Sequence, residues 1–232
     1  MITFNGVTLE SIAPVKIEDI RVSPISYSPV TRDRAFRGGS DFVRMRDGTR
    51  TVTVSFALLE DNLEVRQQYL NAISQWARSD AEYKLLLPHV PNRYLMCVCT
   101  QKPEPSTRQW WESKLKLVFT CYNDPYWNSL FEKSVACGTA FVALGDAPPH
   151  MRIEASRGSA GSHQTYSNGS QSMTFSTIPS GNMVIDLDNQ TAYVGSTSFM
   201  QYYAYTSRFI IPKLGSQTIT GTGTVKYRER WT

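Results

Sequence analysis

The strongest constraint on the fold is a strand-like segment that ends at an abrupt corner. Between Lys114 and Cys121 every second side chain is apolar, which is the pattern of a half-buried antiparallel strand. The strand must end at Asp124-Pro125, because proline has no backbone N–H to donate and restricts the residue before it. Two large aromatic residues, Tyr126 and Trp127, follow at once. Their position favours a surface that packs on another segment or on another subunit.

The amino-acid composition changes near residue 140. Of the 24 basic and 20 acidic residues, 32 lie in residues 1–140 and 12 in residues 141–232, where Ser, Thr and Gly fill 32 of the 92 positions. Gly145 to Pro149, close to this change, has the composition of a linker. We therefore predict two domains, residues 1–140 and residues 141–232, each long enough to bury a core.

The first domain is predicted to be mostly β with one helix. Asn5-Gly6 favours a type I′ hairpin, and residues 50–58 alternate as a strong strand. The period then changes, and an apolar stripe predicts a helix over residues 63–77 that Asp61 or Asn62 would cap. Further strands are expected at residues 83–87, 94–100 and 114–121.

Residues 31–49 are rich in Arg, Gly and Asp and have weak periodicity, which indicates a loop or an extended hairpin arm. Together with Arg50 this stretch has a net charge of +3, from six arginines and three aspartates. Two interpretations remain open: a solvated loop with its own ion pairs, or a subunit interface in which guanidinium groups bind a neighbour's carboxylates. Arg44 and Arg46 are our interface candidates here. The chain's net charge of only +4, without interleaved aromatic residues, argues against sequence-specific nucleic-acid binding.

The second domain shows short alternating segments at close spacing and no helical stripe, which predicts an all-β sandwich. Strands are expected around residues 151–155, 173–175, 183–187, 193, 209–211 and 219–226. Adjacent aromatic residues occur at Trp110-Trp111 and Tyr202-Tyr203. Since neighbours on a strand face opposite ways, one of each pair is expected to meet a partner domain, a subunit or a sugar ring.

The sequence predicts no enzyme, no cofactor and no metal site. The three histidines, His89, His150 and His163, have no partner histidine at metal-ligand spacing, and no Gly-x-Ser-x-Gly motif occurs. A catalytic triad from distant residues stays open. Asp186 and Asp188 share a strand face, but Asp188 is expected to close a turn with Asn189. The four cysteines are interpreted as free thiols, and no apolar run predicts membrane insertion.

Several segments, in this order and spacing, resemble the distal tail protein (Dit) family of long, non-contractile-tailed phages. They are Asp41-Phe42-Val43-Arg44, Arg50-Thr51-Val52-Thr53-Val54-Ser55-Phe56, Phe119-Thr120-Cys121-Tyr122-Asn123-Asp124-Pro125-Tyr126-Trp127, Leu214-Gly215-Ser216-Gln217-Thr218-Ile219 and Tyr227-Arg228-Glu229-Arg230-Trp231. The resemblance covers nearly the whole chain.

The resemblance implies an N-terminal tail-tube-like β-sandwich with one helix and an arm, followed by a C-terminal galectin-like β-sandwich. It also implies a homo-hexameric ring that joins the tail tube protein to a tail tip or fibre protein and to receptor-binding proteins. Such a protein is made in the host cytoplasm and resides at the virion tail tip. The candidate subunit interface comprises Arg44, Arg46, Asp124, Tyr126 and Trp127. The alternative is a carbohydrate-binding module or host-receptor adhesin that acts through the C-terminal sandwich.

Overall fold

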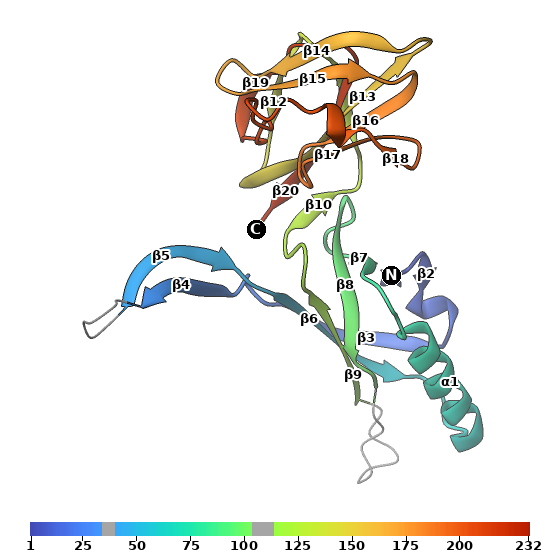
Figure 1. The fold of residues 1–232 in the computed structure, drawn as a ribbon. Helices are drawn as coiled ribbons and strands as arrows, with labels where there is room; N and C mark the ends of the chain where they lie inside the picture. Colours follow the sequence, from blue (N-terminus) through green and yellow to red (C-terminus); the bar gives the residue numbers. More distant parts are fainter. Residues whose placement is uncertain (34–39, 104–113) are drawn as a thin grey trace. The chain divides into compact units, whose positions relative to one another are not determined.

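The computed structural model describes residues 1–33, 40–103 and 114–232, which form two compact units (Figure 1). Unit 1 is Met1–Trp127 together with Thr232, and unit 2 is Asn128–Trp231. Both units consist mainly of antiparallel strands, as predicted. The boundary lies between Trp127 and Asn128 and not at residue 140, because β11 (Lys133–Ala136) is hydrogen-bonded to β20 (Thr224–Trp231) in unit 2.

Unit 1 is built around one antiparallel arrangement of strands. Its order is β3-β6-β9-β8-β7-β1-β2. The elements are β1 (Thr3–Phe4), β2 (Val7–Thr8), η1 (Leu9–Ser11), β3 (Val15–Val22), β4 (Tyr27–Asp33), β5 (Ser40–Asp47), β6 (Arg50–Leu58), α1 (Leu63–Trp76), β7 (Tyr83–Leu86), β8 (Arg93–Gln101) and β9 (Lys114–Cys121). The strand β10 (Trp127–Ser129) spans the boundary between the two units. Asn5 and Gly6 both have positive φ, at 51° and 79°, and so form the predicted hairpin.

The core of unit 1 is an aromatic cluster between the sheet and α1. The Phe4 ring lies 5.8 Å from that of Trp76 and 5.1 Å from that of Phe119. The Trp76 indole also donates to the Val7 carbonyl at 3.1 Å, which fixes the end of the helix on the sheet. Asn62 caps the start of α1 by accepting hydrogen bonds from two backbone N–H groups of the first turn. The predicted helix is therefore confirmed.

Unit 2 is a β-sandwich with its core between two layers of strands. One layer is a sheet in the order β18-β17-β16-β13-β20-β11. Facing it are the pairs β14-β15 and β12-β19 (Figure 1). The elements not yet located are β12 (Ala140–Ala143), β13 (Ala147–Arg157), β14 (Gly161–Ser167), β15 (Ser172–Ile178), β16 (Gly181–Asp186), β17 (Thr191–Val194), β18 (Thr197–Ser198), η2 (Met200–Tyr202) and β19 (Gly215–Thr218). Ile153, Phe175 and Val225 are fully buried between the layers.

Two predictions for unit 2 were wrong. The proposed linker at Gly145 to Pro149 is structured: Gly145 pairs with Arg230, and β13 begins at Ala147. The prolines there are accommodated because the register with β20 shifts between Ala147 and His150. The expected strand at residues 209–211 is an irregular segment, although Ile210 is fully buried. Apolar residues there serve the core without backbone pairing.

The predicted pair Trp110-Trp111 and residues 34–39 of the predicted arm lie outside the described residues. Within the described residues no helix has the length and apolarity needed to cross a bilayer.

Candidate subunit interface

The predicted arm is an extended β-hairpin in unit 1. Its two strands, β4 and β5, form a separate two-stranded sheet (Figure 1). In the antiparallel register Ser28 lies opposite Arg46, and Val30 lies opposite Arg44. Of the two alternatives, a loop or a hairpin arm, the structure has the hairpin in the described part of this segment.

The root of the arm continues the β3-β6 pair through a short network of hydrogen bonds. The Ser26 hydroxyl accepts from the Thr49 N–H at 2.8 Å and lies 2.9 Å from the Thr49 carbonyl. One step closer to the sheet, the Ser23 hydroxyl accepts from the Thr51 N–H at 2.8 Å. Gly48 completes the turn, and its N–H donates to the Ser26 carbonyl at 2.7 Å. These contacts between the two strands of the root fix the direction in which the arm leaves the sheet.

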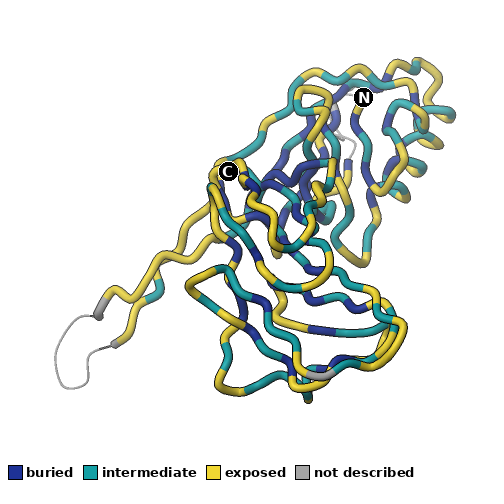
Figure 2. Tube along the Cα trace, turned by 90° about the horizontal axis from the view of Figure 1, so that it is seen from above, coloured by how far each residue is buried: buried dark blue, intermediate teal, exposed yellow. Residues whose placement is uncertain are grey.

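The arm exposes large apolar side chains to solvent. Tyr27, Phe42, Val43 and Met45 are 55%, 63%, 56% and 54% exposed. Figure 2 shows the hairpin as a predominantly exposed segment. A two-stranded hairpin is marginally stable by itself in water, and neighbouring exposed apolar side chains mark contact surfaces. The arm therefore has the properties of a surface that another chain covers.

The predicted arginines lie on this arm. Arg44 and Arg46 are exposed and, as alternate residues of β5, face the same side of the hairpin. Met45 lies between them and faces the opposite side, where Pro29 is its cross-strand partner. The arm thus has a basic face and an apolar face, which would let it bind carboxylates and apolar groups at the same time.

The predicted corner touches the root of the arm. The Tyr126 hydroxyl donates to the Asp47 carboxylate at the end of β5. The Asp124 carboxylate is nearly buried and accepts from the Tyr126 N–H at 3.4 Å, which fixes the turn. The structure therefore places Tyr126 and Asp124 next to the root of the arm, although they lie far from it in the sequence.

Trp127, by contrast, is only 8% exposed, and its indole lies edge-on to the His89 ring at 6.5 Å between centroids. It is therefore not an exposed anchor in the single chain. Sequence reasoning also missed Glu82, whose carboxylate accepts from the Tyr122 and Asn123 N–H groups at 2.7 and 3.0 Å. A separation of about forty residues gives no local signal for such a contact.

A cavity of about 550 Å³ lies beside the arm root in unit 1. It is lined by Val22, Ser23, Pro24, Ile25, Tyr27, Arg50, Trp127 and Thr232. The lining thus combines apolar side chains with the buried guanidinium group of Arg50.

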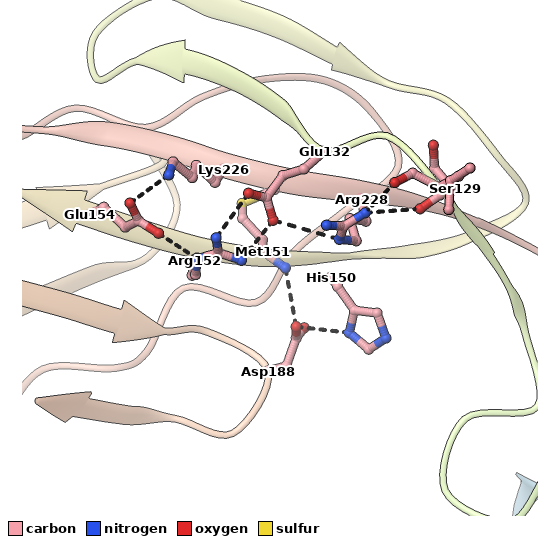
Figure 3. Close-up of polar contacts among 10 residues, drawn as sticks. Ser129, Glu132, His150, Met151, Arg152, Glu154, Asp188, Lys226 and Arg228 are labelled. Carbon is pink, nitrogen blue, oxygen red and sulfur yellow. Dashed lines mark hydrogen bonds and ion pairs between the residues drawn. The ribbon is translucent and has the colours of Figure 1, made fainter. Parts of the chain in front are cut away.

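Unit 2 has a second polar cluster, on the strands β13 and β20 (Figure 3). Its charges alternate in a ladder. Arg152 binds Glu132 in bidentate fashion at 2.7 and 2.8 Å and binds Glu154 at 2.7 Å. Lys226 also binds Glu154, at 2.7 Å, while Arg228 donates to two backbone carbonyls. Hydrogen bonds from Lys226 and then Arg152 lower the pKa of Glu154 below its ordinary value. The charged side chains of the ladder thus hold one another in fixed positions.

Next to the ladder lies a cavity of about 310 Å³ that includes His150, Asp188 and Asn189. The Asp188 carboxylate accepts from the Met151 N–H at 3.1 Å and lies 2.9 Å from the His150 ring nitrogen Nδ1. The turn is closed by Asp186, which accepts from the Asp188 and Asn189 N–H groups, so the prediction that Asp188 closes it was wrong. Among residues 1–33, 40–103 and 114–232, no group of three or more His, Cys, Asp or Glu is arranged to hold a metal.

The fold has a full-length counterpart among solved structures. The structure matches the Dit protein of phage SPP1, described as a paradigm of the hub adsorption apparatus in phages that infect Gram-positive bacteria. The TM-score is 0.75 at 15% identity, over 100% of this chain and 98% of that chain. Two structures of the phage P2 baseplate in its activated conformation, with Ca and with Sr, match at a TM-score of 0.46 and 8% and 9% identity, over 94% of this chain and 91% of each.

No protein-family model and no curated protein sequence matches the chain. The full-length match to the SPP1 Dit protein confirms, at the level of the fold, the resemblance to Dit proteins seen in the sequence.

Proposed function

We propose that this chain is a structural hub of a phage tail tip, a distal tail protein whose six copies form a ring. The ring would join the tail tube protein to a tail tip or fibre protein and to receptor-binding proteins. The full-length fold likeness to the SPP1 Dit protein supports this assignment. The observation that carries it is the exposed arm, because a hairpin whose apolar and basic side chains are left exposed by the described residues needs a neighbour.

The arm supplies one of the two patches that a ring requires. Subunits in a closed ring make heterologous contacts, so each presents two different surfaces. In our proposal the arm of one subunit lies on the next, Met45 packs against apolar groups, and Arg44 and Arg46 bind carboxylates. Asp124 and Tyr126 hold the arm root through Asp47, and Trp127 supports the corner from within the subunit.

The proposal gives the protein a mechanical role and no catalytic one. It needs no cofactor, no metal and no bound nucleic acid, and it places the protein in the virion tail after synthesis in the host cytoplasm. The ion pairs of unit 2 are satisfied by one another, as expected for a rigid support and not for a reacting site.

Native mass spectrometry of the purified protein, alone and with tail tube and tip proteins, tests the proposal. We expect hexamers or stacked hexamers at micromolar concentration. Met45→Asp and the double variant Arg44→Glu/Arg46→Glu should weaken each contact about 30- to 1,000-fold, as losses of roughly 2–4 kcal/mol at an interface do. The melting temperature of the subunit should not change, because these side chains are exposed.

Two matched variants in unit 2 serve as controls. Val142→Asp places the same charge at another exposed apolar residue, and Arg208→Glu reverses another exposed cation. Both should assemble normally. A protein that stays monomeric under every condition, or arm variants that assemble as well as these controls, would refute the ring.

A second candidate function is saccharide binding by unit 2. The observation in its favour is the polar cavity lined by His150, Asp188 and Asn189. His150 and Asp188 lie next to the fixed arginine–carboxylate pairs (Figure 3). Sugar hydroxyl groups favour such planar partners of fixed orientation. A glycan array should then show binding that Asn189→Ala abolishes, while the hexamer persists. If no glycan binds, the saccharide function is refuted and only the mechanical role remains.

A further inference from the structure

Two buried cysteines face each other across the centre of unit 1. Cys97 on β8 and Cys121 on β9 are both fully buried and both free thiols. The antiparallel register pairs Val98 with Thr120, and continuing this register by one residue along each strand places Cys97 opposite Cys121. The two thiol groups also interact with each other. Sequence spacing alone did not single out this pair, because the register was needed to find it.

The backbone geometry of such a pair suits a disulfide. Directly opposed residues in antiparallel strands have Cα atoms about 4.5 to 5.5 Å apart. Disulfides join residues whose Cα atoms are about 4.4 to 6.8 Å apart. Because both side chains point into the core from adjacent strands, the two sulfur atoms can be joined without a change of register.

We propose that Cys97 and Cys121 form a cross-strand disulfide when the protein meets a thiol oxidant. With a diazene oxidant such as diamide, the sulfur of one thiolate adds to the N=N bond. The second thiolate then attacks this sulfur and expels the nitrogen pair, which becomes a hydrazine after taking up two protons. Two S–H bonds are thus replaced by one S–S bond, and the protein loses two hydrogen atoms.

The other two cysteines are poor competitors. Cys99 lies two residues from Cys97 on the same strand, and its sulfur is 3.3 Å from the Gln101 carbonyl oxygen. Cys137 belongs to unit 2, whereas Cys97 and Cys121 belong to unit 1. The variant Cys99→Ala/Cys137→Ala therefore leaves a chain in which only the proposed pair can close within one molecule.

Burial sets the rate of this reaction. Removal from water, and then the neighbouring Cys121 thiol, raise the pKa of Cys97 well above its ordinary value. Little thiolate is present at neutral pH, so the pair should oxidise slowly and faster as the pH rises. The two thiols would stay reduced in a reducing cytosol and form the disulfide in an oxidising medium outside the cell. This last point rests on the proposed virion location, whereas the bond itself does not.

The disulfide would link β8 to β9 in the sheet of unit 1. β8 pairs with β7 on one side and with β9 on the other, so it connects the two halves of unit 1. A covalent link between β8 and β9 would hold these halves together against heat or mechanical load, since it restricts the unfolded chain.

The test treats folded Cys99→Ala/Cys137→Ala protein with diamide and maps its peptides without reduction. We expect one intramolecular link between Cys97 and Cys121, a mass lower by two hydrogens, loss of alkylation at both residues, and a higher melting temperature that reducing agent reverses. The triple variant that adds Cys121→Ala should show none of these changes. Links only between molecules, or a link that forms only in denaturant, would overturn the proposal. Either result can occur whether or not the protein forms a ring.

Discussion

Gly48→Ala is the sharpest test of how the arm is held. A Cβ atom at residue 48 would lie 2.3 Å from the Ser26 hydroxyl oxygen and 3.0 Å from the Ser26 carbonyl oxygen. Since the Ser26 hydroxyl is already bound to Thr49 at 2.8 and 2.9 Å, it cannot move without losing these contacts. Loss of two hydrogen bonds costs about 1–3 kcal/mol. We expect the arm root to open while the sheet of unit 1 stays folded.

Hydrogen exchange at the root measures this opening directly. The amides of Ser26, Gly48 and Thr49 all donate within the root network. If the variant weakens the closed state by about 1–3 kcal/mol, their exchange should accelerate roughly 5- to 150-fold, while amides in β6 and β9 keep their rates. Gly158→Ala is the matched control, because its Cβ would meet no atom within 4 Å and its φ is not positive.

A double-mutant cycle decides the mechanism. Ser26→Ala removes the hydroxyl that the new methyl group would meet, so the added cost of Gly48→Ala should be smaller in that background. If the two effects simply add, or if Gly48→Ala leaves exchange at Thr49 unchanged, the root network does not fix the arm and our account is wrong.

Three further predictions concern the cores and the polar ladder. The pKa of Glu154 is lowered, chiefly by Lys226, so its charge stabilises unit 2 at neutral pH and this contribution is lost as the pH falls through the folded-state pKa. Glu154→Gln should therefore flatten the acid side of a plot of melting temperature against pH; an unchanged slope would contradict the assignment. Gly221→Ala places a Cβ 2.3 Å from the Tyr166 ring at a φ of +134°, and should cost unit 2 about 1–3 kcal/mol in chemical denaturation. Trp127→Ala should destabilise the subunit itself by about 3–5 kcal/mol, because the indole is buried. If it melts like the wild type, Trp127 is not part of the subunit core.

The sequence was most informative where a local period decides the structure. In β6 the alternation places Val52, Val54 and Phe56 inside, as predicted, because a strand packed on one face must alternate. The start of α1 was also predictable, since Asn62 and the apolar stripe are short-range signals.

Pairing between distant segments could not be read in the same way. Gly145 to Pro149 has the composition of a linker, yet its backbone pairs with Arg230 of β20 and so belongs to a sheet. Trp127 follows a proline corner that looked exposed, but its environment includes His89, far away in the sequence. The contact of Tyr126 with Asp47 likewise depends on tertiary folding. These positions required the three-dimensional register, which no window of neighbouring residues contains.

The arm of β4 and β5 is already ordered in the single chain, paired from Tyr27 opposite Asp47 to Asp33 opposite Ser40. A segment that folds only on binding loses its conformational entropy in the binding step, which weakens the binding. A preformed hairpin has lost most of that entropy when the subunit folds. Subunits built this way can associate by simple docking, and the association rate depends on encounter more than on rearrangement. The preformed hairpin also exposes the outer backbone edges of β4 and β5 and the apolar side chains of Tyr27, Phe42, Val43 and Met45. The proposed ring would cover these apolar side chains, so subunits outside it should aggregate more readily than subunits within it.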